Sequence, residues 1–276
     1  MSRTPRYKLL LVDVDGTLVG KDGKISEENL AALRAANEAG VRVSICTGRS
    51  MLSSREQIEA LGFDGFHAFY DGGFICQRDS GEELHAGVVP PEAVKRLVEF
   101  AEQHDLYLEL SSGARSYAAR PCPIPELKAM AFDAEHSTGS LEGIWERERI
   151  VQGLVLSKGE ANKALIDEIG RELAPATQIV RGPVVLTPGF DLGVILAGGT
   201  SKGSAIARFC DYHGITPAEV MAVGDWTNDI SMLREAGLGV AMGQAPDEVK
   251  EAADCVTASI DEHGLAEAIK KYLLSG

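Results

Sequence analysis

The run of four consecutive apolar residues at Leu9–Val12 restricts the fold of this chain more than any other feature of its sequence. A strand with one face in water alternates apolar and polar residues, whereas a strand covered on both faces in a parallel sheet reads as a continuous apolar run. Further short apolar runs lie at residues 41–46, 66–70, 191–196, 220–223 and 238–241. Helical patterns lie between most of them: Ser26 to Gly40, Ser50 to Leu61, GGTSKGSAI to about His213, and Thr227 to Gly237. This alternation predicts an α/β protein with a doubly wound, Rossmann-like parallel sheet.

The middle of the chain departs from this pattern. From about Val88 a proline pair opens a helix, and the proline-rich segment ARPCPIPE later interrupts regular structure. A strand, a helix and further short apolar runs, the last at 184–186, then indicate a second α/β layer. We therefore predict a core made of residues 1–87 and 189–276, with residues 88–188 inserted as a second, α/β domain.

Composition and charge exclude several classes of protein. The net charge of −14 opposes binding to a polyanion, and no basic run offsets it, so nucleic acid is not expected as a partner. No apolar run reaches the ~20 residues that cross a bilayer, and the N-terminal residues lack a signal core, so we expect a cytoplasmic protein without membrane contact. The five scattered cysteines indicate neither a disulfide framework nor a zinc site. We expect a monomer or homodimer.

Two acidic residues follow the first apolar run directly. Asp13 and Asp15 are two apart, so in strand geometry both can face the same site, and Gly16 allows a sharp turn beside them. Adjacent carboxylates repel one another unless a cation joins them, and Mg²⁺ prefers carboxylate oxygens. The competing interpretation is a pair of solvated acids at an ordinary strand-to-turn junction.

Other polar groups are expected at the same edge of the sheet, because chemistry collects where parallel strands end. Four motifs supply such groups: Asp13 and Asp15 in DVDGT, Thr47 in TGR, Lys202 in TSKG, and Asp225, Asn228 and Asp229 in GDWTND. Read together, with their spacing, these motifs resemble the haloacid dehalogenase superfamily, in particular its Cof-type phosphatases with a large α/β cap. The resemblance spans nearly the whole chain.

The resemblance implies a Mg²⁺-dependent phosphatase that acts on a small phosphorylated metabolite, such as a sugar phosphate. Asp13 would attack phosphorus and form an aspartyl-phosphate, and Asp15 would serve as general acid and base. Asp13, Asp15 through its backbone carbonyl, and Asp225 would bind Mg²⁺, with Asp229 completing the surroundings of the metal. The inserted domain would close over the site as a lid.

The remaining motif residues are implied to bind the phosphoryl group. Thr47 would offer its hydroxyl, the following residues Gly48 and Arg49 would contact the substrate, and Lys202 would supply positive charge. Asn228 would help to position Lys202. Taken singly, Thr47 also fits a strand-end hydroxyl, Lys202 a solvated lysine, and Arg49 an exposed ion pair.

Three positions depart from the Cof-type pattern. Asp71, in DGG, replaces the usual asparagine after the third strand, which places an extra carboxylate near the expected phosphate. Gln244 and Ile260 replace asparagines later in the chain. Trp226, inside the acidic motif, fits either a pocket wall or a core or interface position. In the cap, Arg115, Arg120 and Trp145 are candidate substrate contacts.

Two other functions remain open at this stage. A phosphotransferase or phosphomutase would use the same residues but pass the phosphoryl group to another hydroxyl. A non-catalytic module phosphorylated on an aspartate, or a silent regulator, would also have strand-end acids, a threonine and a lysine on a doubly wound sheet. Such receiver domains are far shorter than this chain and need no insertion of ~100 residues.

Overall fold

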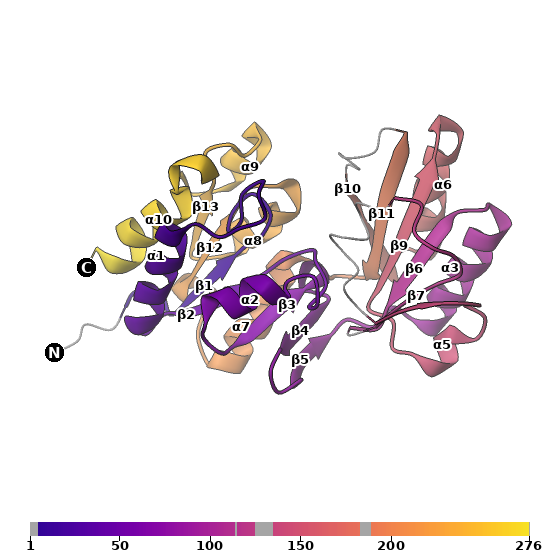
Figure 1. The fold of residues 1–276 in the computed structure, drawn as a ribbon, viewed down its shortest axis with the longest axis horizontal. Helices are drawn as coiled ribbons and strands as arrows, with labels where there is room; N and C mark the ends of the chain where they lie inside the picture. Colours follow the sequence, from indigo (N-terminus) through magenta and orange to yellow (C-terminus); the bar gives the residue numbers. More distant parts are fainter. Residues whose placement is uncertain (1–4, 114, 125–134, 183–188, 276) are drawn as a thin grey trace. The chain divides into compact units, whose positions relative to one another are not determined.

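The computed structural model describes residues 5–113, 115–124, 135–182 and 189–275. The chain separates into two compact units (Figure 1). The first comprises the chain up to Gly48, Ser54–His85, and the chain from Ser201 onward. The second comprises Arg49–Ser53 and Ala86–Thr200.

The first unit is built on a five-stranded sheet whose described pairings are all parallel. In spatial order its strands are β14 (Cys255–Val256), β13 (Leu238–Ala241), β12 (Val220–Gly224), β1 (Leu9–Val12) and β2 (Arg42–Ile45). All four residues of β1 are buried, as expected of a central strand covered on both faces. The predicted α/β fold with a parallel core sheet is confirmed.

Helices cover both faces of this sheet. They are α1 (Glu27–Glu38), α2 (Arg55–Leu61), α7 (Lys202–His213), α8 (Ile230–Glu235), α9 (Asp247–Ala252) and α10 (Gly264–Ile269), with short helical turns at Pro217–Glu219, Thr227–Asp229, Ile260–Glu262 and Lys270–Leu274. Leu9 and Leu11 belong to the core cluster that includes residues of α7, α8 and α9, while α1 packs beside α10. Ser26 caps α1, because its side chain accepts a hydrogen bond from Asn29 N.

The second helix begins five residues later than the sequence predicts. Ser53 N donates to Ser50 Oγ at 3.1 Å, and Ser53 Oγ donates to Ser50 O at 3.1 Å. Serine side chains that bond to nearby backbone groups stabilise turns at the expense of helix. These contacts explain why residues 51–54 form turns and α2 starts only at Arg55.

Strand β3 (Phe66–Phe69) continues into a small sheet with β4 (Phe74–Gln77) and β5 (Glu83–Ala86). Side chains join β3 to β2. Ser44 Oγ donates to Phe66 O at 2.6 Å, and the buried His67 accepts at Nδ1 from Ile45 N at 3.2 Å. Further along, Thr47 N donates to Ala68 O at 2.9 Å. The end of β2 therefore runs close beside β3.

The second unit contains a six-stranded sheet with its own hydrophobic core. In spatial order the strands are β10 (Thr177–Gly182), β11 (Phe190–Ala197), β9 (Gln152–Lys158), β6 (Tyr107–Ser111), β7 (Arg115–Ala118) and β8 (Glu135–Thr138). Helices α3 (Pro91–Gln103), α5 (Ile144–Arg147) and α6 (Glu160–Leu173) contribute to the larger core cluster, together with Leu108, Leu110 and Val155. The run predicted at 184–186 lies outside the described residues.

Strand β11 differs from the sequence prediction in its sheet. The prediction assigned residues from 189 onward to the core, but Phe190–Ala197 pairs antiparallel with β9 and β10. An apolar run shows that a strand is buried and leaves its partners open, so the sequence could not reveal this pairing. Among the described residues, no helix combines the length and apolar character that a membrane span requires.

Candidate active site

A buried lysine joins two carboxylates from different elements of the first unit. Lys202 Nζ lies 2.6 Å from Asp13 Oδ1 and 2.6 Å from Asp229 Oδ1, and all three side chains are buried. The strand β1 leads directly into Asp13, whereas Lys202 is the first residue of α7, which Ser201 caps by accepting from Ser204 N. Two residues that are 189 positions apart in the chain thus form an ion pair.

Burial and shared charge shift the pKa values of this cluster. Burial and the Asp229 carboxylate raise the pKa of Asp13 well above its usual value, against the opposing effect of Lys202. Burial alone would lower the pKa of Lys202, but the carboxylates of Asp13 and Asp229 outweigh it and raise that pKa. The ammonium group therefore stays charged while two carboxylates share it.

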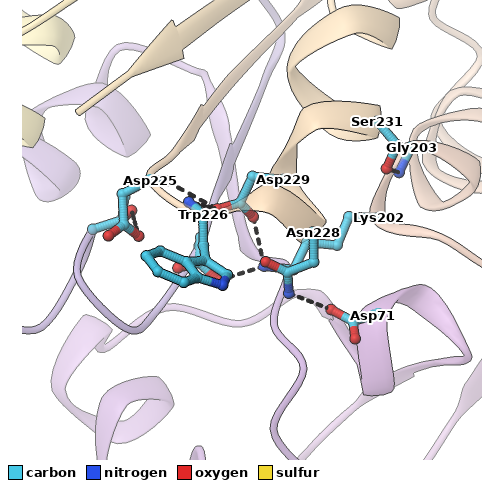
Figure 2. Close-up of polar contacts among 10 residues, drawn as sticks. Asp71, Lys202, Gly203, Asp225, Trp226, Asn228, Asp229 and Ser231 are labelled. Carbon is cyan, nitrogen blue, oxygen red and sulfur yellow. Dashed lines mark hydrogen bonds and ion pairs between the residues drawn. The ribbon is translucent and has the colours of Figure 1, made fainter. Parts of the chain in front are cut away.

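Asp229 also fixes the backbone that carries the neighbouring acid. Its Oδ2 accepts from the amides of Asp225 and Trp226, each at 2.9 Å (Figure 2). These bonds hold the turn after β12 closed. With Oδ1 bound to Lys202, both oxygens of Asp229 are engaged, so this residue positions Lys202 and Asp225. The Trp226 side chain is 44% exposed, which excludes the core position considered for it.

Asp225 is held by residues from two further segments. Thr17 Oγ1 donates to Asp225 Oδ1 at 3.1 Å, and Gln244 Nε2 lies 3.4 Å from Asp225 Oδ2. Gly16 has a φ of +84°, and a Cβ there would lie 2.2 Å from Asp225 Oδ2, so a side chain at this position would displace the acid. Burial, and then the Asp229 charge, raise the pKa of Asp225 to about 6.

The carboxylates of Asp13, Asp225 and Asp229 could hold a metal ion. One oxygen of each lies within 4.8 Å of the others. Three converging carboxylate oxygens form a donor set that suits a hard cation such as Mg²⁺. Burial first, and then the Asp229 carboxylate, raise the pKa values of Asp13 and Asp225, and a bound cation would favour the ionised form of both. The residues present therefore fit this cation.

The remaining predicted site residues occupy different environments. Thr47 is buried, and its carbonyl accepts from Asp71 N at 2.9 Å. The side chain of Asp15 is exposed. Gly48 lies in the first unit next to Asp71, whereas Arg49 belongs to the second unit, where its Nη1 donates to Ser53 O at 3.2 Å.

Asn228 contacts the residue that departs from the Cof-type pattern. Its Nδ2 donates to Asp71 Oδ1 at 2.8 Å (Figure 2). Asp71 has left-handed backbone angles (φ +53°, ψ +36°), which aspartate and asparagine tolerate better than other residues with a Cβ. Its side chain is buried, and this burial raises the pKa of the carboxyl group.

Sequence reasoning missed two residues that organise this site. Thr17 supplies a hydroxyl to Asp225, and Gln244 Nε2 donates to Gly16 O at 2.6 Å while its Oε1 accepts from Ile260 N at 2.9 Å. Thr17 was visible as the last residue of DVDGT. The contact at Ile260 uses a backbone amide, which explains why an isoleucine can stand there.

Comparison with known proteins places these observations in a family. The sequence profile of the haloacid dehalogenase-like hydrolases matches residues 10–269. Among curated relatives, the chain is similar to 5-amino-6-(5-phospho-D-ribitylamino)uracil phosphatase YcsE of Bacillus subtilis. The identity is 30% over 270 residues, which are 97% of this chain and 96% of that protein.

Two solved structures show the same fold over both units. A haloacid dehalogenase-like hydrolase from Bacteroides thetaiotaomicron has a TM-score of 0.81 at 29% identity, covering 96% of this chain and 99% of that one. The haloacid dehalogenase subclass IIB sugar phosphatase BT4131 has a TM-score of 0.76 at 28% identity, covering 96% of this chain and 98% of that one.

Proposed function

This chain belongs to the haloacid dehalogenase-like hydrolases, within the Cof-type phosphatases, and from that premise we propose that it is a Mg²⁺-dependent phosphatase of a small phosphorylated metabolite. It is a phosphoric monoester hydrolase. The observation that carries the proposal is the buried Lys202 Nζ, 2.6 Å from both Asp13 and Asp229, at the carboxyl end of β1. This arrangement holds one carboxylate beside fixed positive charge, as a nucleophile toward an anionic ester requires.

Asp13 acts as the nucleophile in this proposal. Its carboxylate oxygen forms a bond to phosphorus, the bond from phosphorus to the ester oxygen breaks, and an aspartyl-phosphate and an alcohol result. Water then attacks the same phosphorus, and the bond to the Asp13 oxygen breaks to release inorganic phosphate. The charge of Lys202 lowers the cost of bringing a carboxylate against an anionic phosphoryl group.

The residues that would hold Mg²⁺ are Asp13 and Asp225, with the backbone carbonyl of Asp15. When bound, the cation supplies charge neutralisation and orientation for the phosphoryl group. Asp229 supports this site through its bonds to the amides of Asp225 and Trp226.

Asp15 serves as the general acid and then the general base. Its side chain is exposed, unlike that of Asp13, so it can reach the ester oxygen of a substrate that arrives from solvent. It donates a proton to the leaving alcohol and later accepts one from the attacking water. Thr47, the Gly48 backbone and Lys202 bind the phosphoryl oxygens, and Asn228 orients this region, with Arg49 as a further substrate contact.

The second unit is proposed to be the cap that covers the substrate and excludes water during the first transfer. Comparison supports a phosphomonoester of a small metabolite, because YcsE is named for a phosphoribityl ester and BT4131 for sugar phosphates. These two leaving groups differ, so the identity of the alcohol has to come from features of this chain itself.

The test is the release of inorganic phosphate from a panel of phosphomonoesters, with and without Mg²⁺, by the parent protein and by Asp13→Asn. Asparagine keeps the shape and the hydrogen-bonding capacity toward Lys202 but removes the nucleophilic charge. We expect Mg²⁺-dependent release by the parent and a loss of at least 1,000-fold in the variant, an order of magnitude typical for a missing nucleophile. Activity that survives in a folded variant contradicts the role of Asp13, and phosphate transfer only to an added alcohol indicates a phosphotransferase.

A further inference from the structure

Asp71 places a carboxylate against the segment that holds the phosphoryl group in the proposed function. A Cβ built on Gly48 would lie 3.3 Å from Asp71 Oδ1 and 3.4 Å from its Oδ2, so both carboxylate oxygens lie close to the Gly48 backbone. The backbone of the same residue is tied to this segment, because Asp71 N donates to Thr47 O at 2.9 Å. The carboxylate therefore lies beside the Thr47–Gly48 segment, to which the proposed function assigns binding of the phosphoryl group.

The orientation of this carboxylate is fixed from the opposite side. Asn228 Nδ2 donates to Asp71 Oδ1 at 2.8 Å, and the Asp71 side chain is only 6% exposed. The left-handed turn at Tyr70–Gly72 sets the direction in which the side chain leaves the backbone. The acid is thus a built component of the first unit and not a solvated surface group.

No matching positive charge is provided for Asp71 by the contacts of the described residues. The charge of Lys202 favours the ionised form of Asp71 from a distance, but the ammonium group itself is in contact with Asp13 and Asp229. Asn228 is neutral. A phosphate dianion next to Thr47 and Gly48 would therefore meet a carboxylate whose charge is not neutralised by direct contact, and like charges in a poorly solvated site repel strongly.

We propose that Asp71 is a specificity-determining residue, which weakens the binding of a plain phosphate dianion and favours esters whose leaving group carries a hydroxyl or ammonium donor near the phosphoryl group. Such a donor satisfies the carboxylate as the substrate binds, whereas an ester without one leaves it facing an anion. The same repulsion weakens retention of the inorganic phosphate product. The inference rests on the proposed function in one respect, the binding of the phosphoryl group at Thr47 and Gly48.

The first experiment measures the affinity for inorganic phosphate by calorimetry at pH 8 with Mg²⁺ present. Asp71→Asn keeps the shape and can still accept from Asn228, but it removes the charge. We expect this variant to bind phosphate more tightly by on the order of tenfold, since each tenfold step corresponds to about 1.4 kcal/mol of removed repulsion. The matched control is Asp64→Asn, an exposed acid just before β3, which should leave the affinity unchanged.

A gain in affinity cannot arise from a damaged fold, so this readout separates specificity from structure. Phosphate affinity that is unchanged or lower in Asp71→Asn overturns the proposal, as does the absence of measurable phosphate binding in both proteins. If the parent hydrolyses no ester and the variant still gains phosphate affinity, the proposed function fails while the inference about Asp71 stands.

The second experiment tests whether a hydrogen-bond donor on the leaving group favours the substrate. We would compare kcat/KM for ethyl phosphate, 2-hydroxyethyl phosphate and 2-aminoethyl phosphate, which differ only in the group near the phosphoryl ester. The parent should prefer the two esters with donors, and Asp71→Asn should lose that preference by improving on ethyl phosphate. An unchanged ranking in the variant contradicts the donor part of the proposal.

Discussion

At the scale of single residues, one ammonium group organises the candidate site. Lys202 is buried completely enough that burial alone would favour its neutral form, yet contact with Asp13 and Asp229 keeps it charged. Removing one partner from a buried ion pair leaves uncompensated charge, which is far more costly than losing a surface contact. The position of Lys202 thus links stability to the proposed chemistry.

We predict that Lys202→Met lowers the free energy of unfolding by about 3–5 kcal/mol at pH 8. The loss should be smaller at pH 5, because Lys202 opposes the rise in the pKa of Asp13, so without the lysine Asp13 protonates more readily and its repulsion with Asp229 is relieved. Urea unfolding at both pH values measures this. Lys8→Met, which removes a partly exposed ion pair to Glu219, should cost far less than Lys202→Met. Equal losses for Lys202→Met at the two pH values would contradict the account.

The raised pKa of Asp225 predicts that metal binding depends on pH. Its pKa of about 6 lies above the ordinary value, so ionisation of this acid in the metal-free protein costs stability as the pH rises through about 6. Mg²⁺ binds the ionised form of Asp225. We therefore expect the affinity for Mg²⁺, measured by calorimetry, to fall as the pH is lowered from 7 to 5.

The hydrogen bond from Thr17 supplies the control for this prediction. That bond lowers the pKa of Asp225, so Thr17→Val should move the midpoint of the Mg²⁺ pH profile to higher pH. Thr227→Val, at an exposed position in the neighbouring turn, should leave the midpoint in place. An identical profile in all three proteins would show that Asp225 does not titrate with metal binding.

At the scale of elements, the turn after β3 lies directly against the start of α7. Gly72 has a φ of +88°, and a Cβ there would lie 2.6 Å from Ser201 O. Since Ser201 caps the helix that begins with Lys202, this contact ties the position of Asp71 to that of the lysine. A glycine is required both for the backbone angle and for the close approach.

We predict that Gly72→Ala destabilises the protein by about 3 kcal/mol or more, the sum of an unfavourable φ and a steric clash. Gly81 has a similar φ of +70° but nothing within 4 Å of the added Cβ, so Gly81→Ala isolates the cost of the angle at about 1 kcal/mol. Thermal or urea unfolding compares the two. Equal costs would mean that the contact with Ser201 contributes nothing.

The elements also show what the sequence could and could not predict. Strands β1, β12 and β13 were predictable because continuous apolar runs are typical of buried parallel strands, and α1 because Ser26 is a good capping residue. The start of α2 was not predictable, because serine side chains there form hydrogen bonds with backbone groups that a helix would otherwise use. The sheet to which β11 belongs depends on long-range pairing, which an apolar run does not encode.

The contacts in the candidate site also divide into those that the sequence could predict and those that it could not. Asp13 and Asp229 follow the parallel strands β1 and β12, so their position at strand ends predicted that they would come together. Lys202 begins α7, which follows a strand of the other sheet, so its place was predicted by the resemblance of the motifs. The hydrogen bonds of Thr17 and Gln244 depend on side-chain reach across the tertiary fold, and the sequence could not give these contacts.

At the scale of the whole molecule, each unit has its own hydrophobic core. The residues proposed to bind Mg²⁺ all belong to the first unit, whereas the clusters around α3, α6 and β9 belong to the second. A ligand stabilises the cooperative unit that binds it, by about 2.7 kcal/mol at a concentration 100 times its Kd. Binding of Mg²⁺ should therefore stabilise the first unit and leave the stability of the second unit unchanged.

We predict that Mg²⁺ slows amide hydrogen exchange in β12 and α7, while exchange in α6 stays unchanged. Hydrogen exchange followed by mass spectrometry gives both values in one experiment. Ca²⁺, which prefers more ligands and longer bonds, is a useful comparison. Equal protection of both units would show that they unfold as one cooperative body.

The covalent intermediate on Asp13 is the central claim, and the stereochemistry at phosphorus tests it most directly. A phosphorothioate ester made chiral at phosphorus by sulfur and two oxygen isotopes would be hydrolysed to completion in water enriched in the third isotope, and the configuration of the released thiophosphate determined. Each in-line displacement inverts phosphorus. Two displacements through aspartyl-phosphate predict overall retention, and inversion would contradict the account, because it would mean that water attacks the ester directly.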